Sequence, residues 1–372
     1  MNNDPTSPAV SAEQAVQQAQ LAFKANRIYH LEGRGGGGKT SILVKNLAEA
    51  MGIPSERVFL LNMSGMGPQE MLGYGIVDDE TRDLYFSKPE QWPHRSKVGD
   101  QECLIVLDEF TQWEHASMSL CRGLVQTTDG IPRIGTHELG SNVHICMTSN
   151  RACDGSRSAV LDAPFVSRAL TNTLEPTLDG FLDWAAGKGL GLSPIYTFLK
   201  YSQGLNERDH FNPPLPQRWD GAPHPTPRSW EAALLLTSDN DLSLLDDHTT
   251  LDITLRGLVG QEAGAASAAF CSTVSDYIDM VDDIRAGTTS FPPREDPAKQ
   301  YAVAFAALRQ AKTECKDDPQ AYISSGSANW LVDKIILDNS TSGEFRSWGF
   351  RTACAVGIPL ELHNKREQMQ GI

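Results

Sequence analysis

A glycine-rich segment of eight residues, Gly33–Thr40, constrains the fold more than any other feature of this chain. Its sequence is Gly-Arg-Gly-Gly-Gly-Gly-Lys-Thr, and it lies between an apolar strand pattern, Arg27–Glu32, and a helical pattern, Thr40–Met51. Glycines in such a segment let backbone N–H groups turn inward and bind an anion at the start of a helix. The pattern is typical of a phosphate-binding loop. The alternative, a flexible glycine linker followed by an incidental Lys-Thr pair, leaves the strand-to-helix context unexplained.

Two side chains at the end of this segment carry the expected chemistry. The Lys39 ammonium would reach the β- and γ-phosphates of a nucleotide, and the Thr40 hydroxyl would bind Mg²⁺. We therefore expect ATP and Mg²⁺ as ligands. The residues predicted to bind the nucleotide are Gly33, Arg34, Gly35, Gly36, Gly37, Gly38, Lys39, Thr40 and Ser41.

A second motif is an uninterrupted apolar run that ends in two acids, Asp108 and Glu109. Such a run suits a central parallel strand covered on both faces, and ligands bind at the carboxyl ends of such strands. Asp108 would orient the Mg²⁺ ion and its waters, and Glu109 would act as the base toward the attacking water. The alternative is that the acid caps the helix that begins near Thr111.

A third apolar strand pattern, Val143–Thr148, runs directly into Ser149 and Asn150. If this strand lies beside the acidic one, the Asn150 amide can hold the lytic water near the γ-phosphate. His144 and Cys146 alternate along this strand, so we interpret them as core residues.

Composition and charge limit the classes of function. The chain of 372 residues has 47 acidic and 32 basic side chains, a net charge of −15, which argues against a broad nucleic-acid-binding face. Its seven cysteines lack Cys-x-x-Cys spacing, as expected for reduced, mostly buried thiols in a cytoplasmic protein. Because no apolar run approaches about 18 residues, we expect no membrane span.

Several ordered motifs resemble the AAA+ ATPases, most closely their MoxR-like branch. The motifs are the glycine-rich segment, LIVLDEF at 104–110, TSN at 148–150, APFVSR at 163–168, PTPRSW at 225–230, PQEMLGYG at 68–75, the stretch 181–199 and GLVGQEAGAASAAF at 257–270. The resemblance implies an α/β fold with a P-loop AAA+ parallel sheet flanked by helices, then a helical lid. With a helical C-terminal extension added, the expected segments are a disordered tail (1–10), the AAA+ α/β domain (11–175), the lid (176–270) and the extension (271–372). The extension would bind a partner or support a ring.

The same resemblance assigns roles to three further residues. Asn150 is similar to the sensor 1 residue, and Arg228 to the sensor 2 arginine that reads the γ-phosphate within one subunit. Arg168 matches the arginine finger that reaches a neighbouring subunit's nucleotide, although the usual Arg-Phe is replaced here by Arg-Ala. That departure leaves Arg151 and Arg157 as alternative fingers.

The function implied by the resemblance is Mg²⁺-dependent ATP hydrolysis in a ring, commonly a hexamer, that remodels or activates a partner complex. MoxR-like relatives often act as chaperones with a partner that bears a von Willebrand factor A domain. Two alternatives remain open: a nucleic-acid motor of the same family, and a nucleotide-dependent scaffold with little turnover.

Overall fold

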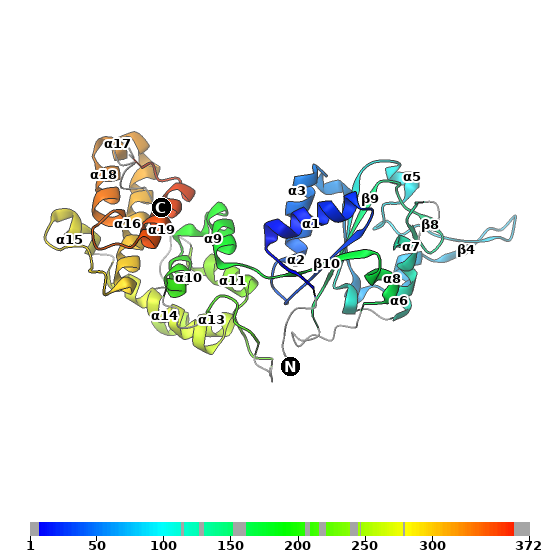
Figure 1. The fold of residues 1–372 in the computed structure, drawn as a ribbon, viewed down its shortest axis with the longest axis horizontal. Helices are drawn as coiled ribbons and strands as arrows, with labels where there is room; N and C mark the ends of the chain where they lie inside the picture. Colours follow the sequence, from blue (N-terminus) through cyan, green and yellow to red (C-terminus); the bar gives the residue numbers. More distant parts are fainter. Residues whose placement is uncertain are drawn as a thin grey trace. The chain divides into compact units, whose positions relative to one another are not determined.

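The computed structural model describes residues 7–112, 115–125, 130–151, 161–204, 209–215, 221–238, 245, 247–277 and 280–360. They belong to two compact units, an α/β unit that ends at Pro176 and a helical unit that begins at Thr177 (Figure 1). The expected α/β fold, a parallel sheet flanked by helices and followed by helical segments, is confirmed.

The α/β unit is built on a six-stranded sheet in the order β1-β10-β2-β9-β6-β3, with every pair parallel. The strands are β1 (Ala9–Val10), β2 (Ile28–Glu32), β3 (Val58–Asn62), β6 (Cys103–Asp108), β9 (Val143–Ser149) and β10 (Ala169–Leu174). The strands predicted from the apolar runs at 27–32 and 143–148, and from the run that ends in Asp108 and Glu109, are therefore confirmed. The apolar pattern at 57–62 likewise predicts a strand, and it forms β3. Strand β9 lies between β2 and β6, so the carboxyl ends of these three strands meet at one edge.

Helices cover both faces of the sheet, because the side chains of its central strands alternate between two hydrophobic cores. In β6, Leu104 and Val106 pack with α1 and the helix after the glycine-rich segment, whereas Ile105 and Leu107 pack with residues of α6, α7 and α8. The helices of this unit are α1 (Ala12–Lys24), α2 (Lys39–Ser41), η1 (Ile42–Leu47), α3 (Ala48–Met51), α4 (Pro68–Leu72), α5 (Arg95–Val98), α6 (His115–Leu120), α7 (Arg122–Val125) and α8 (Ala163–Val166), with the short turns η2 (Ser55–Arg57), η3 (Met63–Gly65) and η4 (Phe110–Gln112).

The helix that follows the glycine-rich segment extends from Lys39 to Met51, as the spacing of its apolar residues predicts. Its middle part, η1, has π-helical hydrogen bonds, which the sequence pattern does not reveal. Gly52 ends the helix in a left-handed conformation, with φ of 69°.

The N-terminal residues differ from the expectation of a disordered tail over 1–10. Residues 1–6 lie outside the described residues, but Ala9–Val10 pair with Thr173 and Leu174 of β10. The Ser7 hydroxyl also donates to the Glu32 carboxylate at 2.6 Å. These partners lie far away in the sequence, so the local composition of the segment could not indicate the pairing.

Two antiparallel hairpins stand apart from the main sheet: β4 (Gly75–Val77) with β5 (Leu84–Phe86), and β7 (Arg133–Ile134) with β8 (His137–Glu138). The first hairpin exposes large apolar side chains, at Tyr74, Ile76, Val77, Leu84 and Tyr85. Figure 1 shows it extending from the α/β unit.

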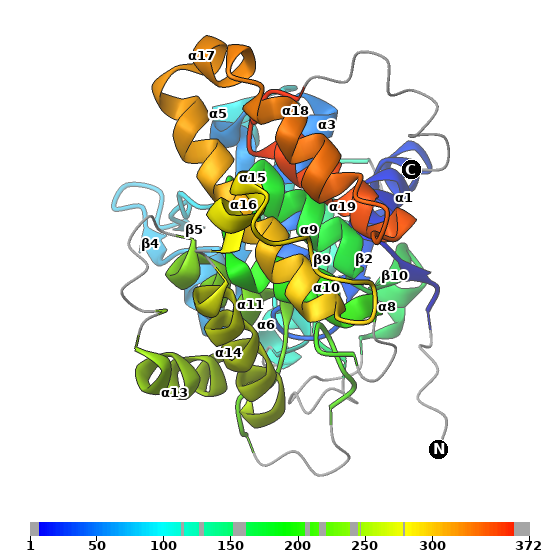
Figure 2. The same cartoon turned by 90° about the vertical axis from the view of Figure 1, so that its left-hand side faces the viewer.

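The helical unit is organised around one long helix, α16 (Figure 2), which contacts α10, α14, α17, α18 and α19. Its helices are α9 (Leu178–Gly187), η6 (Leu190–Leu192), α10 (Pro194–Gly204), α11 (Pro227–Thr237), α13 (His248–Val259), α14 (Gln261–Asp276), α15 (Met280–Ala286), α16 (Pro297–Asp317), α17 (Pro319–Ser324), α18 (Ser327–Leu331), η7 (Val332–Ile336) and α19 (Gly343–Ala355). Among the described residues, no helix combines the length and apolarity needed to cross a lipid bilayer.

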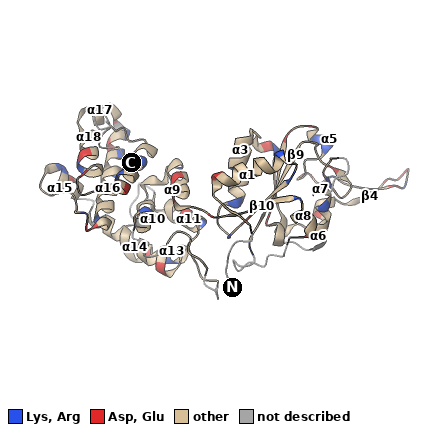
Figure 3. Ribbon diagram, viewed as in Figure 1, with Lys and Arg blue, Asp and Glu red and all other residues tan. Residues whose placement is uncertain are grey.

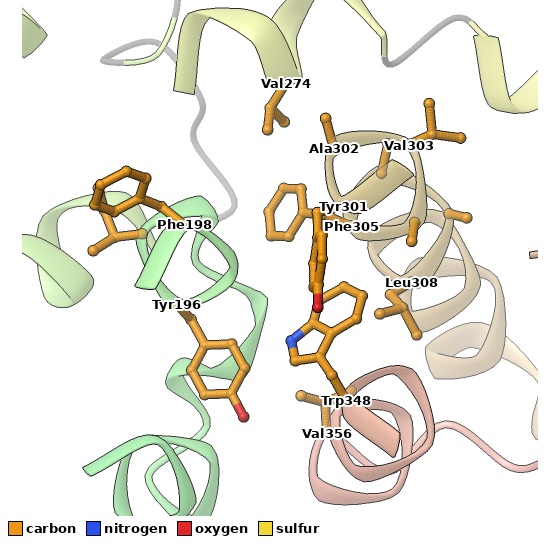
Figure 4. Packing of buried hydrophobic residues seen from close by; sticks show 14 of the residues in the cluster. Tyr196, Phe198, Val274, Tyr301, Ala302, Val303, Phe305, Leu308, Trp348 and Val356 are labelled. Atoms are coloured by element: carbon orange, nitrogen blue, oxygen red, sulfur yellow. The ribbon is translucent and has the colours of Figure 1, made fainter. Parts of the chain in front are cut away.

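The segments expected to be the lid and the extension share one hydrophobic core. Tyr196 and Phe198 of α10 belong to the same buried cluster as Tyr301 of α16 and Trp348 of α19 (Figure 4). The Tyr301 and Trp348 rings have centroids 4.8 Å apart. The boundary expected between residues 270 and 271 falls inside helix α14.

Candidate functional site

The glycine-rich segment forms a loop from the carboxyl end of β2 to the start of α2. Gly36 and Gly38 have φ of 77° and 93°, a left-handed conformation that favours glycine. Gly33 donates its N–H to the Ser149 carbonyl at 3.2 Å, and a Cβ there would lie 3.0 Å from the Leu174 carbonyl oxygen. The glycines therefore allow both the turn and its close approach to β9 and β10.

The Lys39 side chain is buried beneath this loop, with 8% of its surface exposed. Its ammonium donates to the carbonyl oxygens of Gly33 at 2.8 Å and Arg34 at 2.7 Å, and to the Asn150 amide oxygen at 2.9 Å. An ammonium has three protons, so these oxygens match its full donor capacity. The loop and the end of β9 thus hold one cation between them.

The acids at the end of β6 lie beside the same loop. The Thr40 hydroxyl donates to Asp108 Oδ1 at 2.7 Å, and the Thr148 hydroxyl donates to the same oxygen. The backbone N–H of Glu109 donates to Thr148 Oγ1 at 3.1 Å. Hydrogen bonds therefore connect the loop, β6 and β9.

Glu109 leaves the strand in an unusual backbone conformation. Its φ is 55°, in the left-handed region that non-glycine residues rarely adopt. The Gln112 N–H donates to the Glu109 carbonyl at 3.0 Å, which begins the turn η4. Backbone strain of this kind gathers at functional sites, where surrounding contacts hold it.

The Thr40 hydroxyl and the Asp108 carboxylate offer oxygen donors, the ligands that Mg²⁺ prefers. Mg²⁺ is commonly held by one or two carboxylates together with substrate phosphates and waters. Within the described ranges, no group of three or more His, Cys, Asp or Glu residues forms a metal cage of the protein alone. The two oxygen donors, Thr40 Oγ1 and the Asp108 carboxylate, fit a Mg²⁺ ion whose other ligands are waters or phosphate oxygens.

The remaining residues of the predicted loop differ in exposure. Arg34 is buried, whereas Gly35 and Ser41 are exposed. A Cβ on Gly35 would meet nothing within 4 Å, so this position is open, while one on Gly37 would lie 3.3 Å from the Arg34 carbonyl.

Arg168 lies at the other end of the sheet from this loop. It immediately precedes Ala169, which pairs with Ile28 at the start of β2, whereas the loop follows Glu32 at the end of that strand. At about 3.3 Å per residue, the separation along the strand is roughly 16 Å. The Arg168 guanidinium donates to the Pro164 carbonyl at 3.3 Å and to Ser167 Oγ at 3.1 Å.

The other predicted arginines lie elsewhere. Arg228 is an exposed residue in the first turn of α11, in the helical unit, where Thr226 caps the helix and Ser229 completes the capping box. Arg151 directly follows Asn150 and is half-buried. Arg157 lies outside the described residues.

Sequence reasoning missed a buried polar contact under the loop. His30 Nε2 lies 2.8 Å from Ser149 Oγ, and its Nδ1 lies 3.4 Å from Thr171 Oγ1. The pKa of His30 is lowered to about 4, chiefly by burial; the nearby Glu32 charge opposes the shift and the Lys39 charge adds to it. The imidazole is therefore neutral at pH 7. The position of His30 within a central apolar strand could have indicated that it is buried, but not its partners.

Sequence reasoning also passed over Thr148, which contacts both acids. The residue was visible only as part of the TSN motif at 148–150, without a role. The signal available was its place at the carboxyl end of an apolar strand, directly after the buried Met147.

Comparison with known protein families finds no match, and none of the curated proteins matches significantly. Among solved structures, NtrX from Brucella abortus is similar at 14% sequence identity and a TM-score of 0.34, over 64% of this chain and 53% of that chain. NtrX in complex with ADP is similar at 13% identity and a TM-score of 0.33, over 80% of this chain and 62% of that chain. The chain thus spans less than two thirds of the length of either structure.

Proposed function

We propose that this chain is an AAA+ ATPase of the MoxR-like branch, which hydrolyses ATP with Mg²⁺. One observation carries the proposal: Lys39, Thr40, Asp108, Glu109 and Asn150 converge around a glycine-rich loop, at the carboxyl edge of three parallel strands. The Lys39 ammonium and the loop N–H groups can bind a triphosphate there. They lie next to the carboxylate of Asp108, which suits a metal ion, and that of Glu109, which suits an attacking water.

The residues divide the chemistry as follows. On nucleotide binding, Lys39 exchanges its carbonyl partners for phosphate oxygens, and the loop N–H groups bind the remaining charge. Thr40 and Asp108 would hold Mg²⁺, and the ion would supply positive charge toward the phosphates. Glu109 accepts the proton of a water as that water bonds to the γ-phosphorus, and the bond to the β-phosphate oxygen breaks. Asn150 orients this water.

We further propose a homo-oligomeric ring, commonly a hexamer in relatives, with sites completed between subunits. The position of Arg168, at the far end of β10 from its own loop, supports a role at a neighbour's nucleotide rather than at its own. Arg228 would read the γ-phosphate in the same subunit. Arg151 and Arg157 remain the alternative fingers.

The proposed work of the ring is remodelling of a partner complex, with a protein that bears a von Willebrand factor A domain as one candidate. The exposed apolar side chains of the β4–β5 hairpin support protein contact, because exposed apolar clusters commonly bind other proteins. Acidic and basic residues are interspersed on the helices (Figure 3), which disfavours the alternative of a nucleic-acid motor. We also propose a cytoplasmic location, which the free thiols of the described cysteines support.

The test is ATP hydrolysis measured as phosphate release with Mg²⁺. Glu109→Gln should slow hydrolysis by about 10²- to 10⁴-fold while ATP binding persists, because an amide cannot accept the proton. The matched control is Glu102→Gln, at the opposite end of β6, where the carboxylate contacts His144 at 2.8 Å. No hydrolysis by the unsubstituted protein, with or without DNA, RNA or candidate partners, would favour the scaffold alternative.

A further inference from the structure

Thr148 is a buried threonine at the point where β6 and β9 end. Only 1% of its surface is exposed. Leu107 of β6 pairs with Met147 of β9, so the next residues along the two strands, Asp108 and Thr148, lie side by side. The strand register thus places a hydroxyl next to the metal-binding candidate.

The two hydrogen bonds of Thr148 have fixed directions. A backbone N–H can only donate, so the hydroxyl oxygen must accept from Glu109 N. An ionised carboxylate can only accept, so the hydroxyl proton must point to Asp108 Oδ1. One hydroxyl therefore fixes the Asp108 side chain and the Glu109 backbone at once.

The hydrogen bond from the Glu109 N–H to Thr148 Oγ1 bears on the left-handed conformation of Glu109. A φ of 55° directs the Glu109 side chain differently from the alternation that β6 would continue. In the described structure, Thr148 supplies the hydrogen bond to the N–H of this strained residue, and Gln112 supplies the one to its carbonyl.

We propose that Thr148 is a positioning residue, which holds Glu109 and Asp108 in the orientations that ATP hydrolysis needs. The inference rests on the proposed ATPase function and assigns Thr148 no contact with the substrate. Its contribution would be to keep the Glu109 carboxylate directed at the water and Asp108 Oδ1 directed at Thr40. Preorganisation of this kind affects the chemical step more than substrate binding.

The test compares Thr148→Val with Thr148→Ser. Valine keeps the shape but removes both hydrogen bonds, so kcat should fall by about tenfold or more, with KM and ATP affinity within about threefold. Serine keeps the hydroxyl and should restore most of kcat. The control is Thr173→Val, which removes a buried hydroxyl from β10 that contacts Ser7 and Glu32 instead of the two acids.

A second measurement does not depend on turnover. Amide hydrogen exchange at Glu109 should accelerate in Thr148→Val and stay slow in Thr148→Ser, with the rest of β6 protected in both. A wild-type kcat in Thr148→Val, or unchanged amide exchange at Glu109 in that variant, would overturn the inference about Thr148. In that case, loss of activity in Glu109→Gln would still support the ATPase proposal. No turnover by the unsubstituted protein would instead refute the proposed function, and the exchange data would still decide whether Thr148 holds Glu109.

Discussion

The Lys39 ammonium lies 2.9 Å from the amide oxygen of Asn150, which joins the glycine-rich loop to the end of β9. The same ammonium also binds two loop carbonyl oxygens, so the cation that should meet the phosphates is held by the protein itself. In the proposed mechanism, a bound nucleotide would replace these oxygens. Asn150 would then be released from Lys39 and could orient the attacking water.

Replacing Lys39 with alanine should weaken ATP binding by at least about tenfold, or ~1.4 kcal/mol, because it removes the buried cation directed at the phosphates. Lys45→Ala is the control, since Lys45 is exposed on the same helix. Calorimetric titration with ATP and Mg²⁺ measures both. Equal affinities for the two variants would contradict the assignment of the loop.

Mixing two inactive variants tests whether Arg168 acts at a neighbouring site. Arg168→Ala should bind ATP but lose hydrolysis by about 10³-fold or more, as for other arginine fingers. Glu109→Gln disables a subunit's own site, so mixed rings should regenerate some sites with both residues intact and recover phosphate release. The matched control is a mixture of Arg168→Ala with unsubstituted protein.

A mixture that stays inactive although mixed rings form would argue against Arg168. Complementation by Arg151→Ala or Arg157→Ala in its place would identify the finger as the corresponding arginine.

Substituting Glu109 with glycine should stabilise the α/β unit while abolishing hydrolysis. Glycine adopts a φ of 55° without the steric penalty of a side chain, which amounts to about 1 kcal/mol. Urea unfolding would measure the gain. Asn26→Gly, at φ of 53°, is the control and should gain less, because asparagine tolerates this conformation. A lower stability for Glu109→Gly would show that the Glu109 side chain contributes more than its backbone conformation costs.

The buried His30 predicts a specific dependence of stability on pH. Its folded pKa of about 4 is below the ordinary 6.5, so the unfolded chain binds more protons between these values. The free energy of unfolding should therefore fall as the pH decreases from about 6.5 toward about 4, and His30→Gln should reduce that slope. The pKa of His94 is also lowered by burial and acts in the same direction, so some slope will remain. His248→Gln, at an exposed position, is the control, and an unchanged slope in His30→Gln would contradict the prediction.

Two glycines in neighbouring helices should respond in opposite ways to alanine. A Cβ on Gly264 of α14 would lie 2.5 Å from the Arg256 backbone, so Gly264→Ala must separate α13 from α14 and lower stability by about 1–3 kcal/mol. Gly257 of α13 has open space around it, so Gly257→Ala should raise stability by about 0.5–1 kcal/mol. Thermal unfolding of both variants compares them. A stabilised Gly264→Ala would mean that the two helices are not in such close contact.

The sequence was informative where one physical requirement dominates. Buried parallel strands need uninterrupted apolar runs, so β2, β3, β6 and β9 were recognisable, and their carboxyl ends had to meet. The glycines, Lys39 and Asp108 could be predicted to share one site for a chemical reason: binding a phosphate and a metal ion restricts the residue types.

Other features depend on contacts between distant residues, which local patterns cannot reveal. The hydroxyl of Thr148 and the imidazole of His30 acquire their roles only from the strand register. The common core of α10, α16 and α19 was likewise hidden, because helical periodicity shows that a face is buried but not against which partner.

The pairing of β1 with β10 has a practical consequence for work with fragments. A protein trimmed to start at Ser11 would lose the two-residue strand Ala9–Val10 and leave backbone groups of Thr173 and Leu174 without their partners. Unpaired strand edges recruit other chains and promote aggregation. Insoluble material from such a fragment would therefore reflect the unpaired edge of β10 and carry no information about the site. Any affinity tag belongs ahead of Ser7, so that residues 7–10 are retained.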